Sequence, residues 1–257
     1  MQKFKVANLF GIPIYIDLTI GLLMAYILLF LGGTIEYRAV MAVMLPVSIL
    51  LHELAHSLVG KLFGGHIVEI TLYLLGGRAV ISRMPYKPWQ ELLVALAGPV
   101  LSILLGFLFW GAFYLLASLS SPFSITMHFL LDVFASLCLL NFGLAIFNLM
   151  PAFPMDGGRI LRSALECCML SRVKATTVAV VVGRVFAVFW FTLWVSDFIF
   201  GVHIDVTAWN CPEWMMFIFA ILFSSGGIVL PLIAYMIWIS GMQELNLVRQ
   251  EADYYGD

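Results

Sequence analysis

Two histidines and a glutamate, His52, Glu53 and His56, lie within SILLHELAHSLVGKLFG (residues 48–64), a segment that is otherwise largely apolar. An ionisable side chain at bilayer depth costs several kcal/mol, so these residues are expected to have a function there. Positions i and i+4 of a helix share a face, which lets both imidazoles bind one ion while Glu53 reaches a water beside it. This HExxH spacing is typical of zinc hydrolases and predicts a single Zn²⁺ with Glu53 as general base. The alternative, two buried histidines satisfied by neighbouring helices, leaves Glu53 unexplained.

A third protein ligand is expected, because a catalytic zinc usually has three together with a water. The candidate is Asp156 in FNLMPAFPMDGGRIL, residues 147–161. Pro151 and Pro154 are predicted to end the preceding helix, and the Asp-Gly-Gly segment is expected to be irregular rather than helical. Irregular backbone at membrane depth is tolerated only where it lines a cavity or is buried in protein. Asp156 is therefore predicted to reach the same depth as the two histidines.

The composition indicates an integral membrane protein. Of the 257 residues, 63% are hydrophobic and only 11% are charged, against about 25% charged in soluble domains. Apolar runs recur without a polar block long enough to fold separately, which predicts a single membrane domain over residues 1–257. A helix needs about 20 apolar residues to cross the bilayer. Six such helices are predicted, near residues 17–32, 40–62, 92–117, 127–149, 177–200 and 215–240.

Basic residues predict the orientation of these helices. They gather before the first helix and after the second, fourth and sixth: Lys3, Lys5, Lys61, Arg78, Arg83, Lys87, Arg159, Arg162, Arg172, Lys174 and Arg249. The loops on the opposite side hold Arg38 as their single basic residue. Since positively charged loops stay in the cytoplasm, both termini and the opening of the active site are expected on the cytoplasmic side.

HELAH in one predicted helix is joined to N-x-x-P-x-x-x-x-D-G at the end of a later one, here Asn148, Pro151, Asp156 and Gly157. Together they resemble the site-2 protease family of intramembrane zinc metalloproteases, in a form without PDZ or CBS domains. FGIPIYID, LYLLGGRA and LAGPVLS look like further segments of that family, so the likeness covers most of the chain. The resemblance implies zinc ligation by His52, His56 and Asp156. It also implies that Glu53 is the general base and that Asn148 faces the substrate.

Two asparagines are candidates for substrate or oxyanion binding. Asn148 has a neutral side chain that both donates and accepts, so it could steady the oxyanion or hold the substrate backbone. Asn141 lies seven residues earlier on roughly the same face; it either lines the same cavity or forms an interhelical hydrogen bond. Two positions depart from the family: Ser102 stands where Asn is frequent and Met155 where Leu is frequent. They put one supporting polar contact and local packing in doubt.

The segment HIVEITLYLLGGRAVISR, residues 66–83, is rich in β-branched and aromatic residues and contains a Gly-Gly pair. It predicts a small β-hairpin or sheet between the second and third membrane helices of an otherwise all-α fold. A transmembrane substrate must unwind before zinc reaches a peptide carbonyl. In related proteases a small sheet occupies this place, and its edge either receives the extended substrate by strand addition or is merely structural.

The function predicted is therefore an intramembrane zinc endopeptidase that cuts a single-span membrane protein. Membrane lipid is the surroundings, nothing predicts a nucleic-acid partner, and control is expected from a regulatory membrane partner, prior trimming of the substrate or a gate between helices. The alternative is a metal-ion transporter or channel, which would place polar groups along several helices rather than at one depth. A membrane di-iron oxygenase is a further alternative, but five histidines are too few for its usual ligand set.

Overall fold

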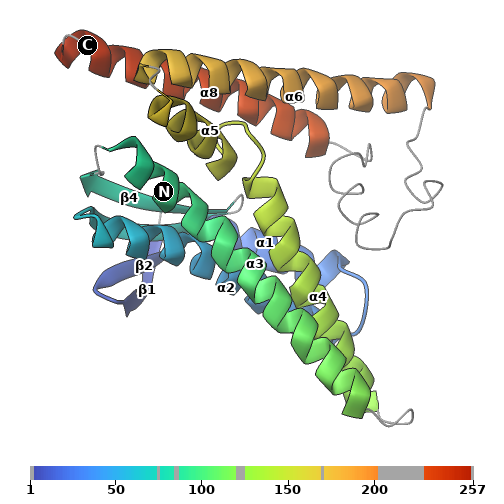
Figure 1. Cartoon of the computed structure of the whole chain (residues 1–257). Coiled ribbons are helices and arrows are strands. Elements are labelled where there is room, and N and C mark those ends of the chain that lie inside the picture. Colours follow the sequence, from blue (N-terminus) through green and yellow to red (C-terminus); the bar gives the residue numbers. More distant parts are fainter. Residues whose placement is uncertain are drawn as a thin grey trace. The chain divides into compact units, whose positions relative to one another are not determined.

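The computed structural model describes residues 3–73, 76–83, 87–119, 125–168, 171–201 and 229–255. The chain forms two compact units, Met1–Ala145 and Ile146–Asp257 (Figure 1). The boundary between them falls in the last turn of helix α4 (Ile125–Asn148).

The first unit contains a four-stranded sheet in the order β1-β2-β3-β4. β1 (Lys3–Leu9) and β2 (Ile12–Asp17) form one antiparallel hairpin, β3 (His66–Tyr73) and β4 (Gly76–Arg83) form another, and β2 pairs with β3 in parallel. The hairpin predicted at residues 66–83 is thus confirmed, whereas the N-terminal hairpin was not predicted. Its two turn residues, Phe10 and Gly11, have φ angles of 53° and 77°, as a two-residue turn matched to the strand twist requires.

Helix α2 (Ile35–Leu62) carries the HExxH motif and packs against one face of the sheet (Figure 1). The shared core is aliphatic, with Ile14 and Ile70 from the strands against Ile49 and Leu54 from the helix. The helix ends in a Schellman motif: the Gly65 N–H donates to the Gly60 carbonyl at 2.9 Å and the Gly64 N–H to the Lys61 carbonyl at 3.0 Å. Gly64 supplies the positive φ of 83° that this end requires, and β3 begins two residues later.

Helix α3 (Pro88–Leu119) runs beside α2, and α4 lies against α3 through aromatic contacts. The rings of Phe107 and Phe142 meet edge to face with centroids 5.1 Å apart. A side chain at Gly106 would come within 2.8 Å of the Phe142 ring, so this glycine lets α4 approach α3.

The second unit consists of α5 (Asp156–Cys167), α6 (Arg172–Phe200) and α8 (Val229–Tyr255). α6 and α8 run side by side, and α5 packs against α6 (Figure 1). Their core joins Trp190 of α6 to Ile237 of α8 and includes Met150 and Ala152 from the loop before α5.

The segment after the two prolines corrects one expectation. α4 ends at Asn148, before Pro151, as predicted. The Asp-Gly-Gly segment, however, is regular helix, because it forms the first turn of α5. The N–H groups of a first turn need no partner within the helix, so two glycines are tolerated there.

The predicted membrane helices are confirmed in part. Among the residues that the structure describes, four helices are long and apolar enough to cross a membrane: Ile35–Leu62, Pro88–Leu119, Ile125–Asn148 and Arg172–Ser196. α1 (Leu18–Phe30), capped by hydrogen bonds from the Thr19 N–H and hydroxyl to Asp17, has 13 residues, fewer than the roughly 20 that span a bilayer. Residues 215–228 of the sixth predicted helix lie outside the described residues, and α8 begins at Val229. The count of six stays a prediction.

Candidate metal centre

His52 and His56 are buried one turn apart on α2, with 3% and 4% of their surfaces exposed. Their Nε2 atoms are 3.2 Å apart and their rings are nearly perpendicular, at 79°. The HExxH motif is thus helical, and both imidazoles present the same nitrogen to one point, as the spacing predicted.

The tautomers of these histidines follow from their other ring nitrogens. His56 Nδ1 lies 2.6 Å from the carbonyl oxygen of Val94, which can only accept, so the Nδ1–H must donate to it. A neutral His56 then has its lone pair on Nε2. His52 Nδ1 lies 2.9 Å from the Ser102 hydroxyl, which can accept in the same way. With both Nδ1 atoms as donors, each Nε2 keeps a lone pair, and two such lone pairs directed to one point suit a metal ion.

Gly98 of α3 keeps space open beside the two Nε2 atoms. A Cβ at this position would lie 2.2 Å from His56 Nε2 and 2.7 Å from His52 Nε2. Both distances are far shorter than any allowed contact, so α3 approaches the histidines through a residue that has no side chain. Sequence reasoning did not single out Gly98; its signal is a glycine inside the long apolar helix, in LAGPVLS.

Glu53 is the residue after His52 on α2 and is half-buried. A Cβ on Gly77 of β4 would come within 2.3 Å of Glu53 Cγ and 3.2 Å of Glu53 Oε1. The strand backbone therefore passes directly over the predicted general base. The hairpin and the HExxH helix are parts of one site within the first unit.

Asp156 is the first residue of α5 and is buried, with 8% of its surface exposed. The loop before it folds back over the first turn of the helix. A Cβ on Gly157 would lie 2.1 Å from the Met150 carbonyl oxygen, and one on Gly158 would lie 2.8 Å from the backbone of Ala152. The two glycines are required because the loop and the helix share this space.

His52, His56 and Asp156 form a group that could hold one metal ion. Each of the three offers one ligand atom, two from the first unit and one from the second. Two imidazole nitrogens and one carboxylate oxygen suit Zn²⁺ and leave a fourth position for water or substrate.

The two asparagines differ in their surroundings. Asn141 is completely buried, and its amide N–H₂ donates to the Leu137 carbonyl at 2.8 Å and to the Ser48 hydroxyl of α2 at 3.3 Å. This is the interhelical hydrogen bond that the sequence left open as an alternative. Asn148 is the last residue of α4 and is half-buried.

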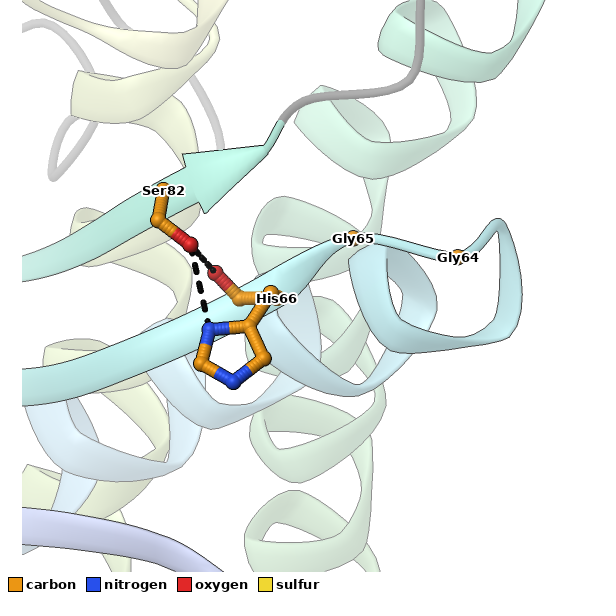
Figure 2. Close-up of a pocket in the computed structure, with 4 residues that line it drawn as sticks. All are labelled: Gly64, Gly65, His66 and Ser82. Carbon is orange, nitrogen blue, oxygen red and sulfur yellow. Dashed lines mark hydrogen bonds between the residues drawn. The ribbon is translucent and has the colours of Figure 1, made fainter.

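A pocket of about 550 Å³ lies at the end of α2 and is lined by Gly64, Gly65, His66 and Ser82. In Figure 2 the His66 side chain on β3 lies next to the Ser82 hydroxyl on β4, with His66 Nδ1 3.1 Å from Ser82 Oγ. The Ser82 hydroxyl also donates to the His66 carbonyl at 3.3 Å. None of the predicted site residues lines this pocket.

The chain is similar to known peptidases over most of its length. The sequence model of Peptidase family M50 matches residues 40–192, a range that contains both the HExxH motif and Asp156. A zinc metalloprotease of Methanocaldococcus jannaschii is 36% identical over 183 residues, which cover 71% of this chain and 51% of that protein. The solved structure of a site-2 protease from Methanocaldococcus jannaschii has a TM-score of 0.58 and 28% identity, with 95% of each chain covered. The chain spans about half the length of the curated relatives it matches.

Proposed function

Because the chain belongs to Peptidase family M50, we propose that it is an intramembrane zinc endopeptidase that cuts a transmembrane segment of a membrane-protein substrate. The observation that carries the proposal is the histidine pair, which is buried in an apolar helix. The two Nε2 atoms are 3.2 Å from each other and are directed to one point. An uncompensated polar cluster at that depth would be costly, and a metal ion accounts for it.

In this proposal His52, His56 and Asp156 hold the zinc, whose bound form supplies Lewis acidity towards water and the scissile carbonyl. The Glu53 carboxylate takes a proton from water and later passes it to the leaving amine nitrogen. The Asn148 amide donates to the oxygen on which negative charge develops. The hydrogen bond from Asn141 to Ser48 supports an interhelical role for Asn141, with any contact to substrate secondary.

The β-sheet is proposed to receive the unwound substrate. β4 is an edge strand of the sheet within the described residues, so one side of its backbone is available for pairing. Because Gly77 lies against Glu53, a peptide added along β4 would run past the general base. Main-chain pairing also fits the chemistry, since a substrate that has left its own helix needs new partners for its N–H and carbonyl groups.

The orientation proposed places both chain ends and the opening of the site on the cytoplasmic side, by the distribution of Lys and Arg. The substrate class proposed is a single-span protein, with a regulatory membrane partner as one means of control. The alternative of a metal-ion transporter or channel is not supported by the relatives, which are named as metalloproteases.

Cleavage of a labelled single-span peptide in detergent or liposomes tests this function. Activity is expected to disappear with a zinc chelator and to return when zinc is added back. The Glu53→Gln protein serves as the matched control for contaminating proteases, and cleavage that survives both chelation and this substitution would refute the proposal.

A further inference from the structure

Arg162 is a cation buried in the second unit, on the α5 helix that begins with Asp156. Only 3% of its side chain is exposed. Its Nη1 donates to a carboxylate oxygen of Glu244 on α8, and its Nε lies 3.8 Å from Glu166, one turn further along α5. Its guanidinium carbon lies 5.3 Å from the centre of the Phe153 ring.

A buried charge is costly unless it is paired, so these contacts are strong constraints on local geometry. Arg172, at the start of α6, completes the cluster with a contact of 3.7 Å to Glu166. Arg162 and Arg172 thus both lie close to Glu166. Arg162 is the buried centre of this cluster, whereas 41% of the Arg172 side chain is exposed.

Phe153 connects this cluster to the candidate zinc ligand. It lies three residues before Asp156, in the loop that folds over the first turn of α5. Its ring is buried against Val180 of α6 and Leu245 of α8. Arg162 therefore contacts the loop before Asp156, the helix that follows Asp156 and the C-terminal helix α8 at the same time.

We propose that Arg162 is a positioning residue, which holds Asp156 in place by fixing this loop and α5 to Glu244 of α8. The proposal rests on the proposed function, in which Asp156 is a zinc ligand. Arginine suits this role better than lysine, because a planar guanidinium can stack on an aromatic ring while it donates to a carboxylate.

The test measures the zinc dissociation constant of the detergent-purified full-length protein by competition with a chelator. Arg162→Gln is expected to weaken zinc binding by about 10-fold to 100-fold, as loss of an outer contact to a metal ligand does. Arg162→Lys, which keeps the charge without the planar group, should fall between Arg162→Gln and the unsubstituted protein. The absorption spectrum of the Co²⁺-loaded protein should also change in Arg162→Gln, because it reports ligand geometry.

Arg172→Gln is the matched control, since it removes the exposed arginine of the same cluster. An exposed ion pair contributes little, so its zinc affinity should stay within about twofold of the unsubstituted value. If Arg162→Gln does not fold, Glu244→Gln replaces it as a milder change, because 32% of Glu244 is exposed. It should weaken zinc binding in the same direction.

Unchanged zinc affinity and an unchanged Co²⁺ spectrum in Arg162→Gln, or in Glu244→Gln as its substitute, would overturn the proposal. Equal losses in Arg162→Gln and Arg172→Gln would do the same. Asp156→Ala, measured in parallel, separates the two levels of inference. If Asp156→Ala keeps its zinc, Asp156 is not a ligand and the proposed ligand set is wrong. If Asp156→Ala loses its zinc but Arg162→Gln keeps it, only the positioning role of Arg162 is wrong.

Discussion

At the scale of single residues, the orientation of the two histidines depends on atoms outside the HExxH motif. The Val94 carbonyl fixes the tautomer of His56, and the Ser102 hydroxyl contacts His52 where the family frequently has asparagine. The supporting contact that this departure put in doubt is therefore supplied by serine. Such partners of a metal-binding histidine set its ring orientation and its basicity.

Replacing His52, His56 or Asp156 by alanine should lower bound zinc and proteolysis together. Each residue is proposed to supply one of three protein ligands, and a catalytic zinc site with two is weak. Zinc per protein chain, measured by metal analysis after purification, checks this. Full zinc occupancy in Asp156→Ala would exclude that residue from the ligand set.

Glu53→Gln should keep its zinc and lose most of its activity. The amide is nearly isosteric with the carboxylate but cannot accept the proton, so a loss of about 10²-fold to 10⁴-fold is expected. Single-turnover cleavage and metal analysis of the same preparation separate chemistry from binding. Near-normal cleavage would show that another group is the base.

Gly98→Ala should weaken zinc binding although no proposed ligand changes. The new Cβ would lie 2.2 Å from His56 Nε2, so α3 or the histidine must move. A loss of at least about tenfold in zinc affinity is expected, as for other disturbed outer contacts. Gly111→Ala is the control, because it makes the same change in the same helix with nothing within 4 Å. Equal zinc affinity in both proteins would contradict the packing of α3 on the histidines.

At the scale of secondary-structure elements, the sheet is joined to the chemistry through α2. α2 ends six residues after His56 in a Schellman motif, and the chain then turns into β3. The hairpin then returns so that Gly77 of β4 lies over Glu53. The element proposed to bind substrate is thus positioned by the same helix that carries Glu53, the proposed general base.

Gly77→Ala should lower kcat while zinc affinity stays unchanged. The added Cβ would lie 2.3 Å from Glu53 Cγ and would displace this side chain, and the three atoms nearest to it all belong to Glu53. Val80→Ala is the control, since Val80 lies on the opposite face of β4. Steady-state cleavage with zinc titration checks this, and a loss of zinc in Gly77→Ala would mean that the strand supports the metal rather than the base.

At the scale of the whole molecule, the depth of the site sets where a substrate can be cut. His52 and His56 lie in the last three turns of α2, and an α-helix rises by about 1.5 Å per residue. With the proposed orientation, the zinc lies inside the hydrocarbon but nearer the cytoplasmic face. Water is then expected to enter from that side.

The scissile bond is therefore expected in the cytoplasmic half of a single-span substrate, near Gly, Asn, Ser or Pro. These residues lower the cost of opening the substrate helix, so leucines in their place should slow cleavage without impairing membrane insertion. Mass spectrometry of the products identifies the bond. A cut in the outer half, or cleavage indifferent to leucine substitution, would contradict the orientation and the unwinding step.

The sequence by itself determined the features that depend on local spacing and composition. These are the membrane class, the helical histidine pair, the hairpin at residues 66–83 and the end of α4 before Pro151, because each follows from side chains a few residues apart. The prediction that the Asp-Gly-Gly segment is irregular was wrong, because the first turn of a helix tolerates glycines that its interior does not.

Only the tertiary structure decided which distant atoms complete the site. The Val94 carbonyl lies 38 residues from His56, and Glu244 lies 82 residues from Arg162. The N-terminal hairpin joins the sheet through a parallel pairing of β2 with β3, across two intervening helices. Gly98 and Gly77 likewise depend on which backbone faces them. Such contacts follow from the packing of whole elements, which no local pattern of residues encodes.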